Sequence, residues 1–401
     1  MADATIILIL QAIRALLFGF GSILLGALFK DAHFEGWQVG LVLTSLLIGN
    51  AAANAVVGFH AERIGRRRLY RILYLLLAVA GAAWGLATAL PILAAAALCG
   101  VLSADVLESG PFTSLEQAML AHVATKAERI RIFGVYNAVA AVAGSIGALL
   151  AGGPEFLGWP HADHRWFLAY VPLGMIAAAL AGQLSAAVEA PKENLTGSEG
   201  KTNSTGAPDS APQQTTTLTR RLCALFAFDA FGGGFVVQSF VAYWIGVRFN
   251  VGLEVLGPLF FGVGMLQGIS FLVAVRLAHR FGLLNTMVFT HLPSNLMLAA
   301  IPFAPSLPWC VALLLGRHTL SQMDVPTRQA YLAALFPPRE LAAVAAATNT
   351  ARLAARPLAP LVAGALLQTA WPGAPFLVAG GLKIVYDLGL YALFRRVKIE
   401  G

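Results

Sequence analysis

The sequence predicts an all-α membrane protein with twelve transmembrane helices in two pseudo-symmetric six-helix bundles. Three observations lead to this prediction. The chain of 401 residues is 58% hydrophobic and only 12% charged, whereas soluble domains carry about 25% charged residues. The apolar residues recur in blocks of about 20, the length that a helix needs to cross a bilayer. A polar segment at residues 189–219 separates two similar sets of these blocks.

The apolar blocks predict the individual spans. A lone segment in lipid must satisfy its own backbone groups, so each block is expected to be a helix. The frequent Gly and Ala suit close helix packing. The first block lacks a basic leader and a small-residue cleavage site, so we expect a retained span. The expected spans are residues 6–29, 37–59, 69–90, 92–119, 131–152, 166–187, 221–247, 255–277, 283–303, 307–334, 341–368 and 374–394.

The basic residues predict the orientation. With both termini in the cytoplasm, only Lys30, Arg165 and Arg248 lie in loops on the opposite side, and the other loop Lys and Arg residues are cytoplasmic. Cytoplasmic loops are enriched in Lys and Arg, so we expect a multi-pass, monomeric protein of the cell inner membrane with both termini cytoplasmic. Residues 189–219 are rich in Ser, Thr, Gly and Pro, and predict a flexible cytoplasmic linker between domains at 1–188 and 220–401.

The two halves show an internal repeat. A shift of 212 positions pairs Gln117-Ala118 with Gln329-Ala330, and Asn137 with Asn349. The same shift also pairs Leu120 with Leu332, Glu128 with Glu340, and Gly152 with Gly364. Repeated halves are typical of secondary transporters, whose substrate site lies near the midplane between the repeats.

Composition and motifs exclude several functional classes. The net charge of +7 lies in short loops between apolar blocks, which indicates positive-inside topology and not nucleic-acid binding. Cys99, Cys223 and Cys310 fall inside apolar blocks without metal-ligand spacing, so we interpret them as small core residues. No phosphate-cradling nucleotide loop and no nucleophile–base pair is found. We therefore expect no enzyme, no metal site and no cofactor.

One loop resembles a known family signature. Gly58-Phe-His-Ala-Glu62-Arg63-Ile-Gly65-Arg66-Arg67-Arg68 resembles the major facilitator superfamily signature between spans two and three, which reads Gly-x-x-x-Asp-Arg-x-Gly-Arg-Arg. Glu62 replaces the acid and keeps its charge. A shift of 217 finds a weaker copy at Arg280 and Gly282. The resemblance implies the major facilitator fold, alternating access, and a central cavity lined by spans one, four, seven and ten.

The resemblance also implies a cytoplasmic gate, because this loop helps to lock the outward-open state in the family. Glu62 would then face the start of a second-half helix, and Glu116 on span four would pair with the loop arginines. Alternatively, the arginines only anchor the topology, and Arg328 pairs locally with Asp324. The residues expected at the gate are Gly58, Glu62, Arg63, Gly65, Arg66, Arg67, Glu116 and Arg328.

Charged residues inside the spans suggest the site. Ionisable groups in a membrane are costly and by default indicate function, although mutual pairing is the plainer explanation. Helical spacing places Asp105, Glu108 and Glu116 on one face of span four, and Arg317, Asp324 and Arg328 on one face of span ten. The residues expected in the substrate cavity are Gln11, Arg14, Asp105, Glu108, Asp229, Arg317, Asp324 and Arg356.

Coupling to protons requires a group that changes its charge. Asp105 and Glu108 lie close together on one face and are the expected proton carriers, and a permanent salt bridge with Arg14 or Arg317 is the alternative. His291 lies in span nine, which the resemblance makes peripheral, so a structural role is expected. Lys383 and Asp387 in span twelve are expected to pair with each other.

These observations predict a secondary transporter whose partners are a small-molecule substrate, protons and the lipid bilayer, with no nucleic acid. Gly144 to Gly153 in span five partly resembles an exporter motif of the family, although close packing of small residues explains it equally well. We expect proton-coupled export of a small organic solute. An organic or phosphorylated anion bound by cavity arginines is the alternative substrate, and a non-transporting membrane sensor is the alternative of another class.

Overall fold

The structure is a computed structural model that describes residues 2–106, 110–123, 126–156, 163–189 and 213–397. All regular elements within these ranges are helices. The first half contains α1 (Ala2–Asp31), α2 (Gly36–Ile64), α3 (Arg66–Leu86), α4 (Leu90–Leu98), α5 (Pro111–Val123), α6 (Lys126–Ala151), α7 (Gly153–Phe156), η1 (His164–Ala169), α8 (Tyr170–Ala181) and η2 (Ala186–Val188).

The second half is also helical, but the spans equivalent to α1 and α6 are interrupted in it. It contains α9 (Gln213–Gly234), α10 (Gln238–Phe249), α11 (Leu253–Phe281), α12 (Leu283–Ala300), η3 (Ile301–Phe303), α13 (Leu307–His318), α14 (Asp324–Leu335), α15 (Pro338–Ala355), η4 (Arg356–Leu358), α16 (Ala359–Leu367) and α17 (Ala374–Phe394). Most of the expected linker, residues 190–212, lies outside the described residues.

The twelve predicted spans correspond to these helices, and the predicted two-bundle membrane fold is confirmed. Eight helical segments in the described ranges are long and apolar enough to cross a bilayer by themselves. Some spans are interrupted near their middle. Spans four, seven, ten and eleven are each divided in two, as α4–α5, α9–α10, α13–α14 and α15–α16.

The interruption of span four differs from the continuous helix expected at 92–119. Helix α4 ends at Leu98, and Gly100 follows with φ +72°, a left-handed conformation that favours glycine. Residues 101–106 are not helical, and α5 begins at Pro111, where the missing N–H of proline leaves no helical hydrogen bond unmade. Irregular backbone at membrane depth is tolerated where it lines a cavity or is buried in protein.

The two bundles pack together at one end through glycine. Helix α1 contacts α10, α2 contacts α16, and α6 contacts α11. A Cβ placed on Gly364 of α16 would lie 2.2 Å from the carbonyl oxygen of Gly36 on α2, and one on Gly40 would lie 2.6 Å from that of Pro360. These helices approach each other so closely because the contact positions have no side chain.

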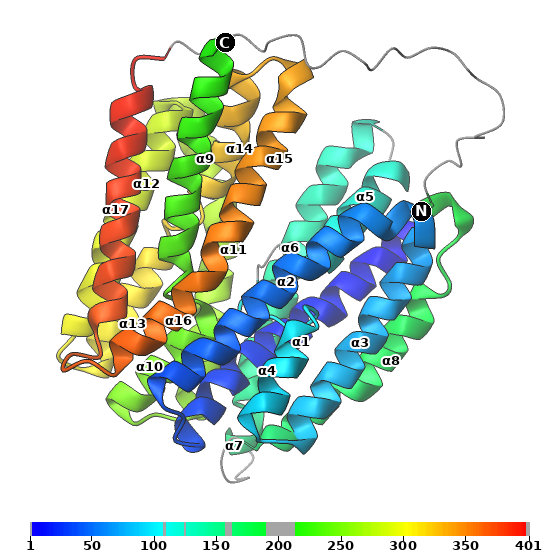
Figure 1. Ribbon diagram of the computed structural model, residues 1–401, viewed down its shortest axis with the longest axis vertical. Coiled ribbons are helices and arrows are strands. Elements are labelled where there is room, and N and C mark those ends of the chain that lie inside the picture. The colour runs from blue at the N-terminus through cyan, green and yellow to red at the C-terminus, as the bar shows by residue number, and fades with distance from the viewer. Residues whose placement is uncertain (1, 107–109, 124–125, 157–162, 190–212, 398–401) are drawn as a thin grey trace.

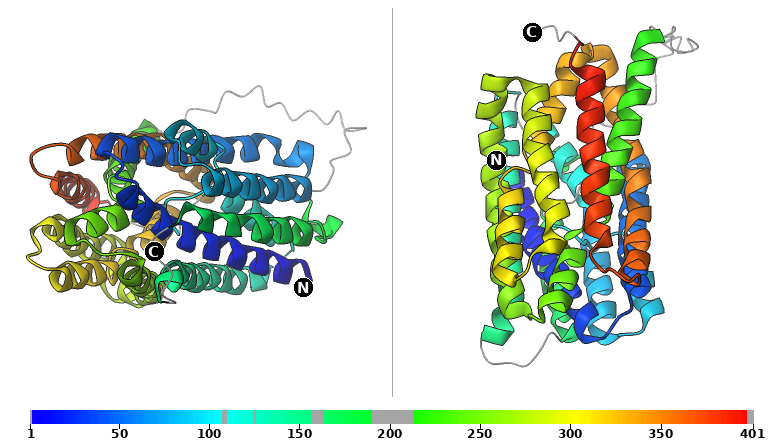
Figure 2. Two further views of the ribbon diagram at one scale, coloured as in Figure 1. Left: turned by 90° about the horizontal axis from the view of Figure 1, so that it is seen from below. Right: turned by 90° about the vertical axis from the view of Figure 1, so that its left-hand side faces the viewer.

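At the opposite end, the bundles diverge. Figure 1 shows a gap between α2 and α15 in the upper part of the view, toward which the start of α9 and the end of α17 also lie. Figure 1 also shows the long helices of the first half inclined to those of the second half, and Figure 2 gives two further views of this arrangement. The helices of the two bundles therefore lie close together at one end, called the closed end, and apart at the end that carries the signature loop, called the open end.

Candidate functional site

A polar cavity of about 420 Å³ lies between the bundles, at the depth where the helices are interrupted. Its volume is in the range of small-molecule sites, about 300–1,000 Å³. Five basic side chains and three carboxylates line it: Arg317, Arg328, Arg352, Arg356, Lys383, Asp105, Asp229 and Asp324. Polar neighbours include Asn50, Gln238, Gln267, His291, His318 and Ser321.

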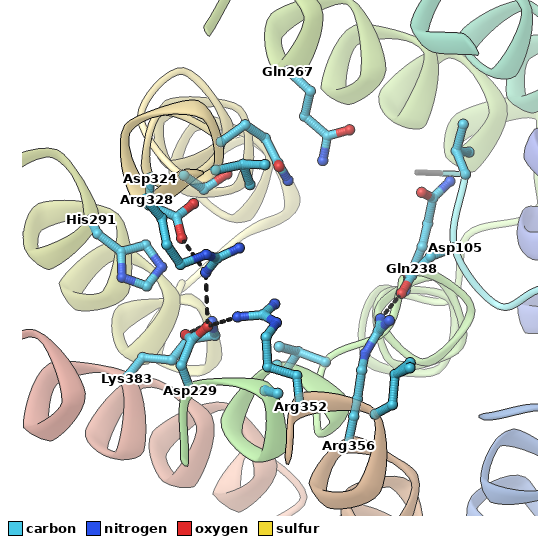
Figure 3. Close-up of a pocket in the computed structure, with 18 of the residues that line it drawn as sticks. Asp105, Asp229, Gln238, Gln267, His291, Asp324, Arg328, Arg352, Arg356 and Lys383 are labelled. Atoms are coloured by element: carbon cyan, nitrogen blue, oxygen red, sulfur yellow. Dashed lines mark hydrogen bonds and ion pairs between the residues drawn. The ribbon is translucent and has the colours of Figure 1, made fainter. Parts of the chain in front are cut away.

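Asp229 is the centre of a charge network in the C-terminal bundle (Figure 3). Its carboxylate lies 2.7 Å from Nζ of Lys383, 3.2 Å from Nη1 of Arg352 and 3.7 Å from Nη1 of Arg328. Arg328 also binds Asp324 at 3.0 Å. Five residues on α9, α14, α15 and α17 thus neutralise most of one another's charge, as buried charges must.

Asp105 occupies the other wall of the cavity and joins the two bundles. It lies in the interruption of span four and pairs with Arg356 of η4. Its Oδ1 also accepts a hydrogen bond of 2.7 Å from the backbone N–H of Gln238, at the start of α10. Beside it, the backbone N–H of Ser239 donates to the carbonyl of Ala104 at 3.2 Å. The interruptions of spans four, seven and eleven therefore meet at this point.

Arg317 is the least compensated cation of the cavity. Its exposed fraction is 8%, and within the described residues its Nε has no hydrogen-bond partner and no carboxylate lies within ion-pair distance of its guanidinium. The adjacent His318 contacts Gln267 at 3.1 Å and Ser321 at 3.3 Å. This corner of the cavity has a buried positive charge and several polar groups, which is an arrangement suited to an anion.

His291 and Asp387 form a second buried pair, behind the Asp229 network. His291 on α12 lines the cavity, and its Nδ1 lies 2.8 Å from Oδ1 of Asp387 on α17. Asn295 donates a hydrogen bond of 2.8 Å to the other carboxylate oxygen. The expected pair between Lys383 and Asp387 is therefore not present: Lys383 reaches Asp229, and Asp387 turns to span nine.

The structure brings five of the eight expected cavity residues together. Asp105, Asp229, Arg317, Asp324 and Arg356 line the cavity, as does Arg328, which was expected at the gate. Glu108, the other expected proton carrier, lies outside the described residues.

Gln11 and Arg14 lie instead in the core of the N-terminal bundle. Arg14 donates to Glu116 from Nε at 3.2 Å and from Nη2 at 2.8 Å, and also contacts Gln11. Glu116 accepts further hydrogen bonds from Tyr70 at 2.7 Å and Tyr136 at 2.5 Å. These groups satisfy the guanidinium inside the bundle, which is why Arg14 does not face the cavity. The expectation for Gln11 and Arg14 is corrected accordingly.

The signature loop has other partners than expected. Because Glu116 binds Arg14, it does not meet the loop arginines. The acid at the loop is Glu189, whose carboxylate accepts hydrogen bonds from the backbone N–H groups of Arg66 at 2.6 Å and Arg67 at 3.2 Å. An acid at a helix N-terminus, here that of α3, is favourable. Arg67 also donates to the carbonyl of Leu184 at 2.9 Å.

The remaining loop residues lie at the surface of the open end. Gly65 adopts φ +94° between α2 and α3, and Gly282 adopts φ +85° between α11 and α12, at the equivalent place of the second half. Glu62 is exposed and lies 3.6 Å from Arg66. Gly58 and Arg63 are exposed on the last turns of α2. The gate role expected for these residues concerns a different conformation, in which the two bundles would meet at this end.

Sequence reasoning missed Arg352, Lys383 and His291 as cavity residues. The family pattern assigns the lining to spans one, four, seven and ten, and these three residues belong to spans eleven, twelve and nine. Charge in an apolar span was the available signal. Gln238 and Gln267 were missed as well, because a neutral amide gives no such signal.

Comparison with known proteins identifies the family. The sequence pattern of the Major Facilitator Superfamily matches residues 7–322. The chain is 24% identical to the uncharacterized membrane protein YJR124C of Saccharomyces cerevisiae (strain ATCC 204508 / S288c), over 95% of this chain and 92% of that protein.

Solved structures share the fold at low identity. The nucleoside transporter NupG superposes with a TM-score of 0.75 at 15% identity, covering 99% of this chain and 100% of its own. A D-xylose-proton symporter gives 0.72 at 16% identity, covering 97% of each chain. The human organic anion transporter MFSD10 (TETRAN) gives 0.64 at 17% identity, covering 97% and 98%. The protein is a multi-pass membrane protein, and the chain belongs to the Major Facilitator Superfamily.

Proposed function

We propose that this protein is a secondary active transporter that moves a small organic solute across the inner membrane by alternating access. The observation that carries the proposal is the cavity between two bundles that are packed together at one end and separated at the other. With the orientation that the basic loops predict, both termini are cytoplasmic and the cavity opens inward. The domains 1–188 and 220–401 then rock about this cavity as a monomer, connected by the linker expected at 189–219, whose residues 213–219 form the start of α9.

The substrate that this cavity suits best is a small organic anion. The lining has five basic side chains against three carboxylates, and Arg317 is buried without a carboxylate partner among the described residues. An uncompensated buried charge is unfavourable, so an incoming carboxylate or phosphate gains an interaction that the empty protein lacks. The structural similarity to an organic anion transporter supports this class.

We further propose coupling to protons and transport in the direction of export. Asp105 and Glu108 are the proton carriers expected from the sequence, and Asp105 faces the cavity, where it pairs with Arg356. The similarity to a D-xylose-proton symporter supports proton coupling. The glycines of span five, which suggested export, also pack closely: a Cβ on Gly147 would lie 2.0 Å from the carbonyl oxygen of Leu16. Because close packing also explains these glycines, the direction of transport depends on the flux experiment.

The test uses purified protein and a defined panel of solutes. Benzoate and succinate represent carboxylates, glycerol 3-phosphate represents phosphate esters, and glucose and uridine represent neutral solutes. We expect thermal stabilisation by an anion and, in proteoliposomes, its flux driven by a pH gradient. Uptake driven by an acidic exterior would indicate symport, and uptake driven by an acidic interior would indicate antiport, which is the coupling that export requires.

Each arm of the experiment has a separate consequence. Stabilisation by carboxylates alone or by the phosphate ester alone separates the two anion types. Flux of a neutral solute with no response to any anion would contradict the substrate class. Binding without flux would identify a non-transporting sensor and overturn the transport proposal.

A further inference from the structure

The pair of His291 and Asp387 differs from every other ion pair around the cavity. Asp229 and Asp324 are paired with Lys383, Arg352 and Arg328, whose charge is permanent near neutral pH. Within the described ranges, the only basic partner of Asp387 is His291. Histidine is the side chain whose charge changes between about pH 5 and pH 8. Among the ion pairs around the cavity, this one therefore contains a side chain whose charge can change near neutral pH.

The pair is buried and its geometry is well defined. Asp387 is fully buried and His291 is 4% exposed. The two groups are 2.8 Å apart, and Asn295 supports the carboxylate through a hydrogen bond of 2.8 Å. A buried carboxylate must be paired or neutral. A proton held between the imidazole and the carboxyl group would meet this requirement for Asp387.

The pair also has access to the cavity. His291 lines it, whereas Asp387 lies behind His291 between α12 and α17 (Figure 3 shows His291 beside Arg328). The edge of the Tyr386 ring packs against the imidazole, with 6.0 Å between the ring centres. A proton entering from the cavity therefore meets His291 first. The other titratable or charged groups that face the same space are Asp229, Lys383, Arg328, Asp324, Arg352, Arg317 and His318.

A change of charge at the pair reaches the moving parts of the fold. Lys383 lies one helical turn before Asp387 on α17 and binds Asp229 of α9. Helix α9 ends at Gly234, immediately before the interruption of span seven. Beyond that interruption, α10 contacts Asp105 through Gln238 and packs on α1 of the other bundle. Protonation at His291 thus alters the electrostatics of a chain of contacts that ends at the interface between the bundles.

We propose that His291 and Asp387 form the proton-binding site of this transporter, taking the role that sequence reasoning assigned to Asp105 and Glu108. The inference rests on the proposed proton coupling, but its test requires no substrate. It gives His291 a role beyond the structural one expected from the sequence, and it leaves Asp105 as a contact between the bundles through Arg356.

The experiment measures how pH changes the separation of the bundles. Spin labels are attached to Phe59→Cys on α2 and Ala346→Cys on α15, two exposed positions on opposite sides of the open end. The native cysteines are first replaced, and the protein is placed in nanodiscs of phosphatidylethanolamine and phosphatidylglycerol. Distances are recorded by double electron–electron resonance between about pH 5 and pH 8, where histidine titrates.

We expect the distance distribution of the parent protein to shift across this range, and we expect His291→Asn and Asp387→Asn to abolish the shift. The matched control is His279→Asn, an exposed histidine at the end of α11, which is expected to retain it. Size-exclusion profiles and melting curves establish that each variant is folded. If Asp387→Asn fails to fold, Asn295→Ala is expected to displace the midpoint of the pH response, because it removes the amide that contacts both His291 and Asp387.

Two results would overturn the inference: a parent protein whose distances do not respond to pH, or a folded His291→Asn variant that responds as the parent does. A failure of the substrate proposal looks different. In that case the distances change with pH, but the anions in the panel neither stabilise the protein nor cross the membrane.

Discussion

Asp105 and Arg356 form an ion pair that connects the interrupted fourth span of one bundle to the interrupted eleventh span of the other. Asp105 also accepts a hydrogen bond from the backbone N–H of Gln238, at the start of α10. The pair lies at the inner boundary of the closed end, where the glycine-packed helices begin to separate. It is placed to stabilise the closed arrangement of that end.

The first prediction concerns this pair. Asp105→Asn is expected to weaken the closed end, because charged hydrogen bonds contribute about 1.5–3 kcal/mol. Differences of about 1–3 kcal/mol change a two-state population by about 5- to 150-fold. The measurement is the distance between labels on Leu86→Cys and Phe303→Cys, two exposed positions at the closed end. We expect a longer-distance population in the variant.

Two further variants test whether the interaction itself is responsible. Asp31→Asn removes an exposed acid at the same end and should leave the distances unchanged. The double variant Asp105→Arg with Arg356→Asp restores opposite charges and should recover part of the short-distance population. An Asp105→Asn protein with unaltered distances would show that glycine packing alone holds this end closed.

The second prediction concerns the core of the N-terminal bundle. Glu116 is fully buried and accepts hydrogen bonds from Arg14, Tyr70 and Tyr136. Glu116→Ala leaves the guanidinium of Arg14 buried without its counter-charge, and breaking a buried pair in this way costs about 3–5 kcal/mol. We expect a marked loss of stability in detergent, measured by thermal unfolding.

A double variant separates the charge effect from the loss of volume. Replacing the pair by apolar residues of similar size, Arg14→Met with Glu116→Leu, is expected to be less destabilising than Glu116→Ala alone, since no unpaired charge remains. Glu62→Gln, at an exposed acid, is the control and should melt as the parent does. Equal melting of Glu116→Ala and the parent would contradict the assigned role.

The sequence predicted the helices well because bilayer thickness and backbone satisfaction leave few alternatives. Hydrophobic length alone locates α1, α2 and α17 to within a few residues. The interruption of span four carried local signals, namely Gly100 and the pair Gly110-Pro111, but apolar composition continued across it. An argument from composition therefore joined two helices that the backbone separates.

Partners of the buried charges could not be predicted in the same way. Helical spacing placed Asp105 and Glu116 on one face of a continuous helix, yet the interruption rotates them apart: Asp105 meets Arg356, and Glu116 meets Arg14. The shift of 212 positions makes Glu116 and Arg328 equivalent. Each of them binds a residue of the first helix of its own half: Glu116 binds Arg14, and Arg328 binds Asp229. Such pairings depend on helix rotation and depth, which a single sequence does not specify.

The third prediction concerns the glycine contact between the bundles. Gly364→Ala would place a methyl group 2.2 Å from the carbonyl oxygen of Gly36, so the two helices must move apart. We expect the closed end to loosen, with a population shift in the Leu86 and Phe303 label distance. Gly381→Ala on α17, where a Cβ meets nothing within 4 Å of the described residues, is the control. An unchanged distance in Gly364→Ala would mean that this contact does not hold the end closed.

The last prediction concerns two effects of replacing Arg317: one on the melting temperature of the ligand-free protein and one on its stabilisation by an anion. Only an anion site is expected to produce both. Because Arg317 is buried without a carboxylate partner in the described part of the chain, Arg317→Gln removes an unfavourable buried charge, and the ligand-free protein should melt at a higher temperature. The same change removes a charged interaction worth about 1.5–3 kcal/mol with a bound anion. Stabilisation by the active anion of the panel should therefore weaken by about ten-fold or more in concentration, since about 1.4 kcal/mol corresponds to ten-fold in affinity. Arg396→Gln, at an exposed arginine beyond α17, should change neither quantity. A purely structural Arg317 would give the opposite first sign, with a lower melting temperature in the ligand-free variant.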